Sequence, residues 1–142
     1  MKPAKIYKIF GMVILGLYFS YNSMASELKE AAAVEAANAW LALIDDGKYG
    51  ESWETAALYF KNAITKEKWE QTLTAVRNPL GQLVSRYLSS KTYMSSIPGA
   101  PDGEYVVIQF KTSFENKKYG IETVTPMLDK DGKWRVSGYY IK

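Results

Sequence analysis

The segment EYVVIQFKTSF, residues 104–114, contains the clearest strand pattern in the chain. Val106, Ile108 and Phe110 alternate with the residues between them, as expected of a strand with two different faces. Three further segments are rich in β-branched and aromatic residues: 83–95, 119–128 and 133–141. We therefore predict four strands in the second half of the chain.

The connections between these segments favour antiparallel pairing. Residues 98–103, PGAPDG, cannot continue a strand ladder and predict a turn-rich loop. Asp131-Gly132 is the dipeptide typical of a tight hairpin turn. Pro126 has no amide hydrogen, so we expect it on an edge or at a bulge. Together with Gly120 and Gly138, it predicts a bent sheet.

The first half of the chain has helical periodicity. Residues 27–44 predict an amphipathic helix with a small-residue face, and a shorter helix is expected over 49–60. A third helix should begin after Thr65, whose hydroxyl can cap its first turn, and end before Pro79.

This element order predicts an α+β domain, in which N-terminal helices pack on one face of a curved four-stranded antiparallel sheet. The arrangement resembles the cone of nuclear transport factor 2-like and cystatin-like folds, and by itself such a likeness transfers no function. No repeat or linker interrupts the pattern, so residues 26–142 are expected to form one domain.

The first 25 residues have the order of a secretory signal peptide. Lys2, Lys5 and Lys8 precede an uncharged, mostly apolar run and the small residues Ser23 and Ala25. We predict cleavage between Ala25 and Ser26, with an uncleaved N-terminal anchor as the alternative. The expected location is the bacterial periplasm, or else the extracellular space, with membrane contact only through the signal peptide during export.

Composition excludes several kinds of site. The chain has no His and no Cys, which rules out chemistry based on imidazole or thiolate. Three of its 18 basic residues lie in the leading segment, and the other 15 balance the 15 acidic residues. We therefore expect no nucleic-acid binding, and only weak salt dependence of any other binding. No cofactor or metal ion is expected, since the acidic pairs at 45–46 and 129–131 lack a full calcium ligand set.

Two arginines suggest an anion site. Arg77 and Arg86 flank the corner between the third helix and the first strand, where they could hold a carboxylate or phosphate bidentately. The alternative, which we favour, is structural. Arg77 would then bind carbonyls at the helix C-terminus, and Arg86 would pair with an acid across the sheet.

Glu122 is the candidate for acid–base chemistry. It lies within a predicted strand, where burial could raise its pKa, and a tyrosine could stabilise an oxyanion beside it. The alternative is a cross-strand ion pair with a base such as Arg135 on the next strand.

The four tryptophans are interpreted as core residues, while tyrosines could line the mouth of the cone. We predict a non-catalytic binding or protein-interaction module, whose mouth holds a small apolar or amphipathic ligand or a protein segment. The alternatives are a proton-transfer enzyme that uses Glu122 with a tyrosine, and a homodimer paired through the open sheet face. The predicted ligand-binding residues are Arg77, Arg86, Tyr105, Glu122, Arg135 and Tyr139.

Several short sequence segments resemble those of a known protein family. They are WLALIDDGKY at 40–49, RNPLG at 77–81, PGAPDGEY at 98–105 and DGKWRVSGYYI at 131–141. In this order the chain resembles the bacterial domain of unknown function 4019 family. The resemblance implies an exported bacterial protein of one small domain, with no established activity and no catalytic residues to transfer.

Overall fold

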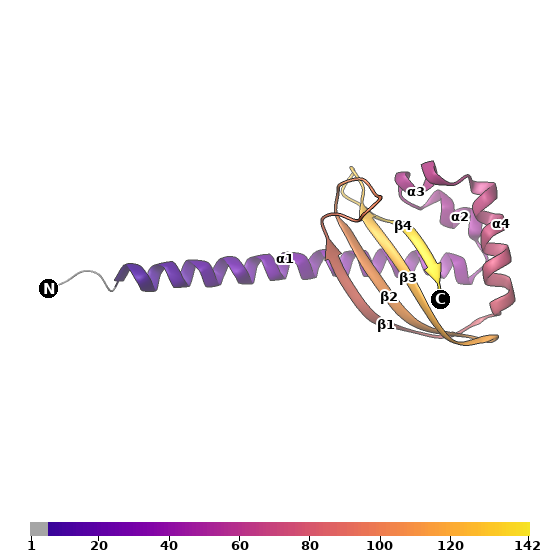
Figure 1. The fold of residues 1–142 in the computed structure, drawn as a ribbon, viewed down its shortest axis with the longest axis horizontal. Helices are drawn as coiled ribbons and strands as arrows, with labels where there is room; N and C mark the ends of the chain where they lie inside the picture. The colour runs from indigo at the N-terminus through magenta and orange to yellow at the C-terminus, as the bar shows by residue number, and fades with distance from the viewer. Residues whose placement is uncertain (1–5) are drawn as a thin grey trace.

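The computed structural model describes residues 6–142, and it describes the side chains of Tyr18 and of residues 20–142. The helices precede the strands, which confirms the α+β class (Figure 1). The elements in chain order are α1 (Ile6–Asp45), α2 (Tyr49–Glu54), α3 (Leu58–Ala63), α4 (Lys66–Arg77), a 3-10 turn (Asn78–Leu80), β1 (Leu83–Met94), β2 (Tyr105–Phe114), β3 (Lys117–Leu128) and β4 (Trp134–Ile141).

The four strands form one antiparallel sheet in the order β1-β2-β3-β4. The pairing register shifts at several points, including between Thr125 and Pro126, so the predicted irregularity at Pro126 is confirmed. Such bulges increase the local twist and bend a strand. The curved sheet with helices on one side is consistent with the nuclear transport factor 2-like cone.

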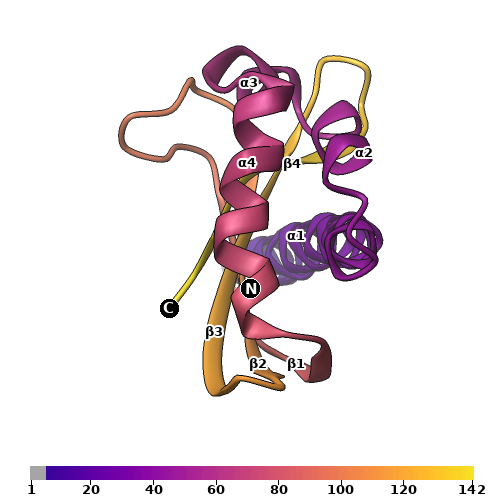
Figure 2. The same ribbon diagram turned by 90° about the vertical axis from the view of Figure 1, so that its right-hand side faces the viewer.

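The C-terminal part of α1 crosses the inner face of the sheet and contacts all four strands (Figures 1 and 2). Ala33 and Ala37 are fully buried there, because their small side chains let the helix approach the strands closely. The predicted alanine face is therefore confirmed. The core around it contains Trp40, Leu41 and Ile44.

The N-terminal part of α1 extends well beyond the sheet (Figure 1). The helix begins at Ile6, much earlier than predicted, and it continues through the expected cleavage position at Ala25 and Ser26. Residues 1–5 of the predicted signal peptide lie outside the described residues. Within the described part of the chain, no helix is both long enough and apolar enough to cross a membrane. Export remains a prediction.

The helix predicted over 49–60 is in fact two helices, α2 and α3. The chain leaves the helical ladder at Ala57, whose N–H donates to the carbonyl of Val136 on β4 at 2.8 Å. A tertiary hydrogen bond therefore overrides the local helical pattern. The third helix is as predicted, since the hydroxyl of Thr65 accepts from the N–H of Lys68 at 3.2 Å and α4 ends before Pro79.

Candidate functional site

Glu122 lies on the inner face of β3 and has no solvent-exposed surface. Its Oε1 accepts hydrogen bonds from Arg86 Nε at 2.7 Å and from the hydroxyl of Thr112 at 2.6 Å. Its Oε2 accepts from the hydroxyl of Tyr139. Both carboxylate oxygens are therefore engaged by neighbouring side chains.

Asp45, at the end of α1, continues this network. Arg86 binds it bidentately, with Nη1 to Oδ2 at 2.7 Å and Nη2 to Oδ1 at 2.9 Å. Arg77 also donates to Asp45 Oδ1, at 3.1 Å, and to the carbonyl of Gly81 at 3.3 Å. The Arg77 guanidinium lies 4.4 Å from the ring centre of Phe114. We call Asp45, Arg77, Arg86, Glu122 and Tyr139 the inner network.

The inner network is electrically balanced, because two arginines face two carboxylates. Burial opposes the charge on Arg86, but hydrogen bonds to Asp45 and Glu122 raise its pKa above the usual value. Burial and the neighbouring Glu122 carboxylate raise the pKa of Tyr139 well above its usual value. Together with Thr112, the network joins all four strands to the ends of α1 and α4.

This geometry favours the structural interpretation of both arginines. Arg86 pairs with an acid across the sheet, as we expected, and Arg77 binds a carbonyl beyond the helix C-terminus. The carboxylate that the two arginines hold is the protein's own Asp45. Because Glu122 is held by a base and by two hydroxyls, its carboxylate has the surroundings of a structural ion pair.

The predicted pairing of Glu122 with Arg135 is wrong. Arg135 lies next to the β3–β4 turn, where it binds Asp129 at 2.9 Å and Asp131 at 2.8 Å. The Arg135 hydrogen bonds lower the pKa of Asp131 to about 2. Among the residues that the structure describes, no group of three or more His, Cys, Asp or Glu side chains could hold a metal ion.

The inner aromatic residues pack against one another. The ring centres of Trp40 and Trp69 are 6.0 Å apart, and those of Trp40 and Tyr139 are 5.2 Å apart. Tyr105, another predicted ligand-binding residue, is buried, and its hydroxyl donates to the carbonyl of Pro101 at 2.5 Å. The core interpretation of Trp40 and Trp69 is confirmed. Because Tyr105 is buried, it does not line an open mouth.

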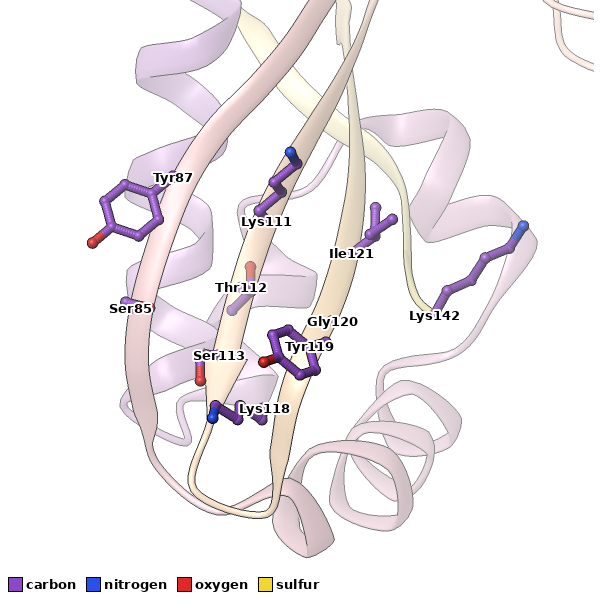
Figure 3. Close-up of a pocket in the computed structure, with 10 residues that line it drawn as sticks. All are labelled: Ser85, Tyr87, Lys111, Thr112, Ser113, Lys118, Tyr119, Gly120, Ile121 and Lys142. Carbon is purple, nitrogen blue, oxygen red and sulfur yellow. The ribbon is translucent and has the colours of Figure 1, made fainter.

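The opposite side of the sheet presents a groove with a volume of about 600 Å³ (Figure 3). We call it the outer groove. It crosses β1, β2 and β3 at the end of the sheet near the β2–β3 turn, on the face turned away from α1. Its lining residues are Ser85, Tyr87, Lys111, Thr112, Ser113, Lys118, Tyr119, Gly120, Ile121 and Lys142.

Strand register explains how these residues meet. Tyr87 pairs with Lys111, and Lys111 pairs with Ile121, so one row of side chains crosses three strands. Backbone hydrogen bonds between Ile121 and Lys142 extend the row. Tyr87, within this row, is 69% exposed, and Tyr119, which also lines the groove, is 82% exposed. Two large aromatic side chains therefore face solvent on the same side of the sheet.

The charged side chains that line the outer groove are all basic. Lys111, Lys118 and Lys142 line it, no acidic side chain does, and none of the three forms an ion pair with the described residues. Lys118 Nζ lies 5.6 Å from the ring centre of Tyr119. Sequence reasoning missed this groove. Strand alternation can indicate that Lys111 and Ser113 share one face of their strand, and that Tyr119 and Ile121 share one face of theirs, but only the pairing register brings the strands' residues together.

The sequence comparisons identify a family whose function is unknown. No curated protein matches the chain. A family model described as "Protein of unknown function (DUF4019)" matches residues 36–139. The matched region contains the whole sheet up to Tyr139 and every residue of the inner network. The chain therefore belongs to the DUF4019 family.

Proposed function

We propose that this protein is a non-catalytic, exported binding module that recognises a partner protein through the outer face of its sheet. Export rests on the signal-peptide pattern of the first 25 residues. The binding surface is the outer groove, rather than the mouth of the cone that the sequence suggested. The inner network holds the sheet in the shape that presents this surface.

The geometry of the inner network supports a structural role for Glu122 rather than a catalytic one. Proton abstraction by Glu122 would need a carboxylate oxygen within reach of a substrate, in a cavity that the substrate can enter. Glu122 is fully buried, and its two oxygens accept hydrogen bonds from Arg86, Thr112 and Tyr139. We therefore assign Glu122 to the stability of the domain.

The observation that carries the proposal is the exposure of Tyr87 and Tyr119 beside the outer groove. Tyrosine is enriched at protein interfaces because its ring supplies a large contact area and its hydroxyl stays compatible with water. Serine residues such as Ser85 and Ser113 add adaptable hydrogen-bonding groups next to the rings.

Site-specific photocross-linking in the cells that make the protein tests the proposal. Benzoylphenylalanine at position 119 places the reactive group in the outer groove, and the same residue at position 58 is the matched control. Leu58 is also exposed, but it lies on α3 in the helical layer. We expect a discrete protein adduct from position 119 and none from position 58.

Equal adduct patterns from the two positions, or no adduct from position 119, would contradict the proposal. The melting temperature of each variant is measured first, so that loss of an adduct is not confused with loss of the fold.

A further inference from the structure

We infer that the partner presents an acidic, extended polypeptide segment, which lies across the outer groove and along the edge strand β1. This inference rests on the proposed function, because it specifies the chemistry of the partner that the same surface binds.

The charge of the groove favours an acidic partner. The two arginines of the strands are neutralised within the protein, Arg86 by Asp45 and Glu122 and Arg135 by Asp129 and Asp131. The groove lysines have no such partner among the described residues, and Figure 3 shows that they lie on both sides of Tyr119. Carboxylates arriving at this surface would complement them.

The position of β1 favours a polypeptide over other polyanions. β1 lies at an edge of the sheet and, among the strands of the described residues, pairs only with β2. An edge strand presents backbone N–H and C=O groups to which a further strand can bind. Ser85 and Tyr87, which line the groove, belong to this strand. A bound segment could therefore hydrogen-bond to the edge while its acidic side chains reach the lysines.

The same charges disfavour a second copy of the chain as the occupant. In a symmetric dimer the same patch meets itself, so two outer grooves would bring the lysines of both copies together. Like charges facing each other across an interface oppose association. The homodimer through the open sheet face is thus the weaker candidate.

Fluorescence anisotropy with purified protein tests the inference. The probe is a fluorescein-labelled random copolymer of glutamate and tyrosine. Labelled polygalacturonate and labelled oligothymidylate serve as a polyanionic glycan and a polyanionic nucleic acid. We expect the polypeptide to bind most tightly, with affinity falling at least about tenfold between about 25 mM and about 250 mM salt.

Variants locate the binding on the protein. Lys111→Glu/Lys118→Glu should weaken binding of the copolymer at least about tenfold, because it reverses two charges in the groove. Lys48→Glu/Lys68→Glu makes the same change in charge at exposed positions in the helical layer, and it should alter the affinity less than about twofold. Melting temperatures of both variants confirm that each is folded.

Three results would overturn the inference: no binding of the copolymer, tighter binding of either other polyanion, or equal effects of the two lysine pairs. These failures are distinguishable from failure of the proposed function. If position 119 cross-links a protein while the copolymer does not bind, the binding module stands and the acidic partner is wrong. If the copolymer binds while position 119 gives no adduct, the proposed function is wrong.

Discussion

Glu122 shows most clearly how a single buried residue can tie the strands of the sheet together on its inner face. A buried carboxylate is costly to remove from water, and it is tolerated only when charged and hydrogen-bonding partners surround it. Arg86, Thr112 and Tyr139 provide these partners from the other three strands. The cost of burying the Glu122 carboxylate is therefore offset only when all four strands are correctly assembled.

Glu122→Gln should lower the free energy of unfolding by about 3 kcal/mol, because it leaves the buried Arg86 guanidinium with one carboxylate instead of two. For a domain of this size, the melting temperature should fall by about 10 °C, measured by circular dichroism. The control is Arg135→Gln, which breaks a more exposed pair and should cost less than about 1 kcal/mol. A Glu122→Gln variant as stable as wild type would contradict the structural role.

The pKa of Asp131 gives a prediction of pH dependence. Hydrogen bonds from Arg135 lower this pKa from 3.8 to about 2, so the ionised form is favoured in the folded state. The resulting stabilisation is fully present above about pH 4 and is lost as the pH falls through about 2.

Asp131→Asn lacks this stabilisation at every pH. The difference in melting temperature between wild type and the variant should therefore narrow as the pH is lowered from about 4 to about 2. A difference that stays constant over this range would show that the ion pair does not form in solution.

At the scale of elements, the fit of α1 against the sheet determines how closely the two layers approach. Ala37 has no exposed surface and belongs to the core cluster that includes Trp40 and Val124. A larger side chain at this position would push the helix away from the strands. The inner network would then be strained too, because Asp45 lies on the same helix.

Ala37→Leu should destabilise the protein by about 1–3 kcal/mol, because the added atoms overpack a filled interface. Ala32→Leu is the matched control on the exposed side of α1, and it should change the stability by less than about 0.5 kcal/mol. Chemical unfolding of both variants measures the difference. Equal costs would mean that α1 does not pack on the sheet as described.

The sequence predicts elements better than it predicts contacts between them. The alternation of Val106, Ile108 and Phe110 and the turn at Asp131-Gly132 depend on neighbouring residues, so the strands were found almost to their ends. The break at Ala57 depends on a hydrogen bond to Val136, which is far away in the sequence. No local pattern contains that information.

In the candidate site, too, the sequence predicts the kind of partner better than the contact itself. The sequence indicated that Glu122 would pair with a base and that Arg86 would pair with an acid, but it did not show that they pair with each other. Their strands are separated by β2, so the contact depends on the register of three strands and on the reach of the Arg86 side chain across β2. The sequence did not indicate that Asp45 would bind both arginines, because its distance from them depends on how α1 crosses the sheet.

At the scale of the whole molecule, the two faces of the sheet differ in how far their polar groups are satisfied. The inner face is covered by α1, and its charged groups are paired within the network. The outer face exposes tyrosines, and three lysines without ion-pair partners line its groove. The balanced total charge of the sequence suggested that binding would depend weakly on salt. The lysines of the outer groove instead favour a strong salt dependence of binding at that surface.

The Tyr87→Ala/Tyr119→Ala variant should keep its stability within about 1 kcal/mol of wild type, since both side chains project from the surface. It should also lose most binding of the glutamate–tyrosine copolymer, because the aromatic contact area is gone. A large loss of stability would show that the rings are needed for folding. Unchanged binding would place the partner elsewhere.

We propose that the outer face binds a partner while Glu122 only stabilises the domain. The most direct test is the yield of adduct from benzoylphenylalanine at position 119, normalised to folded protein, in chains that also carry Glu122→Gln or Tyr87→Ala. We predict that Glu122→Gln leaves this normalised yield unchanged and that Tyr87→Ala lowers it. A yield that falls with Glu122→Gln and persists with Tyr87→Ala would contradict the account.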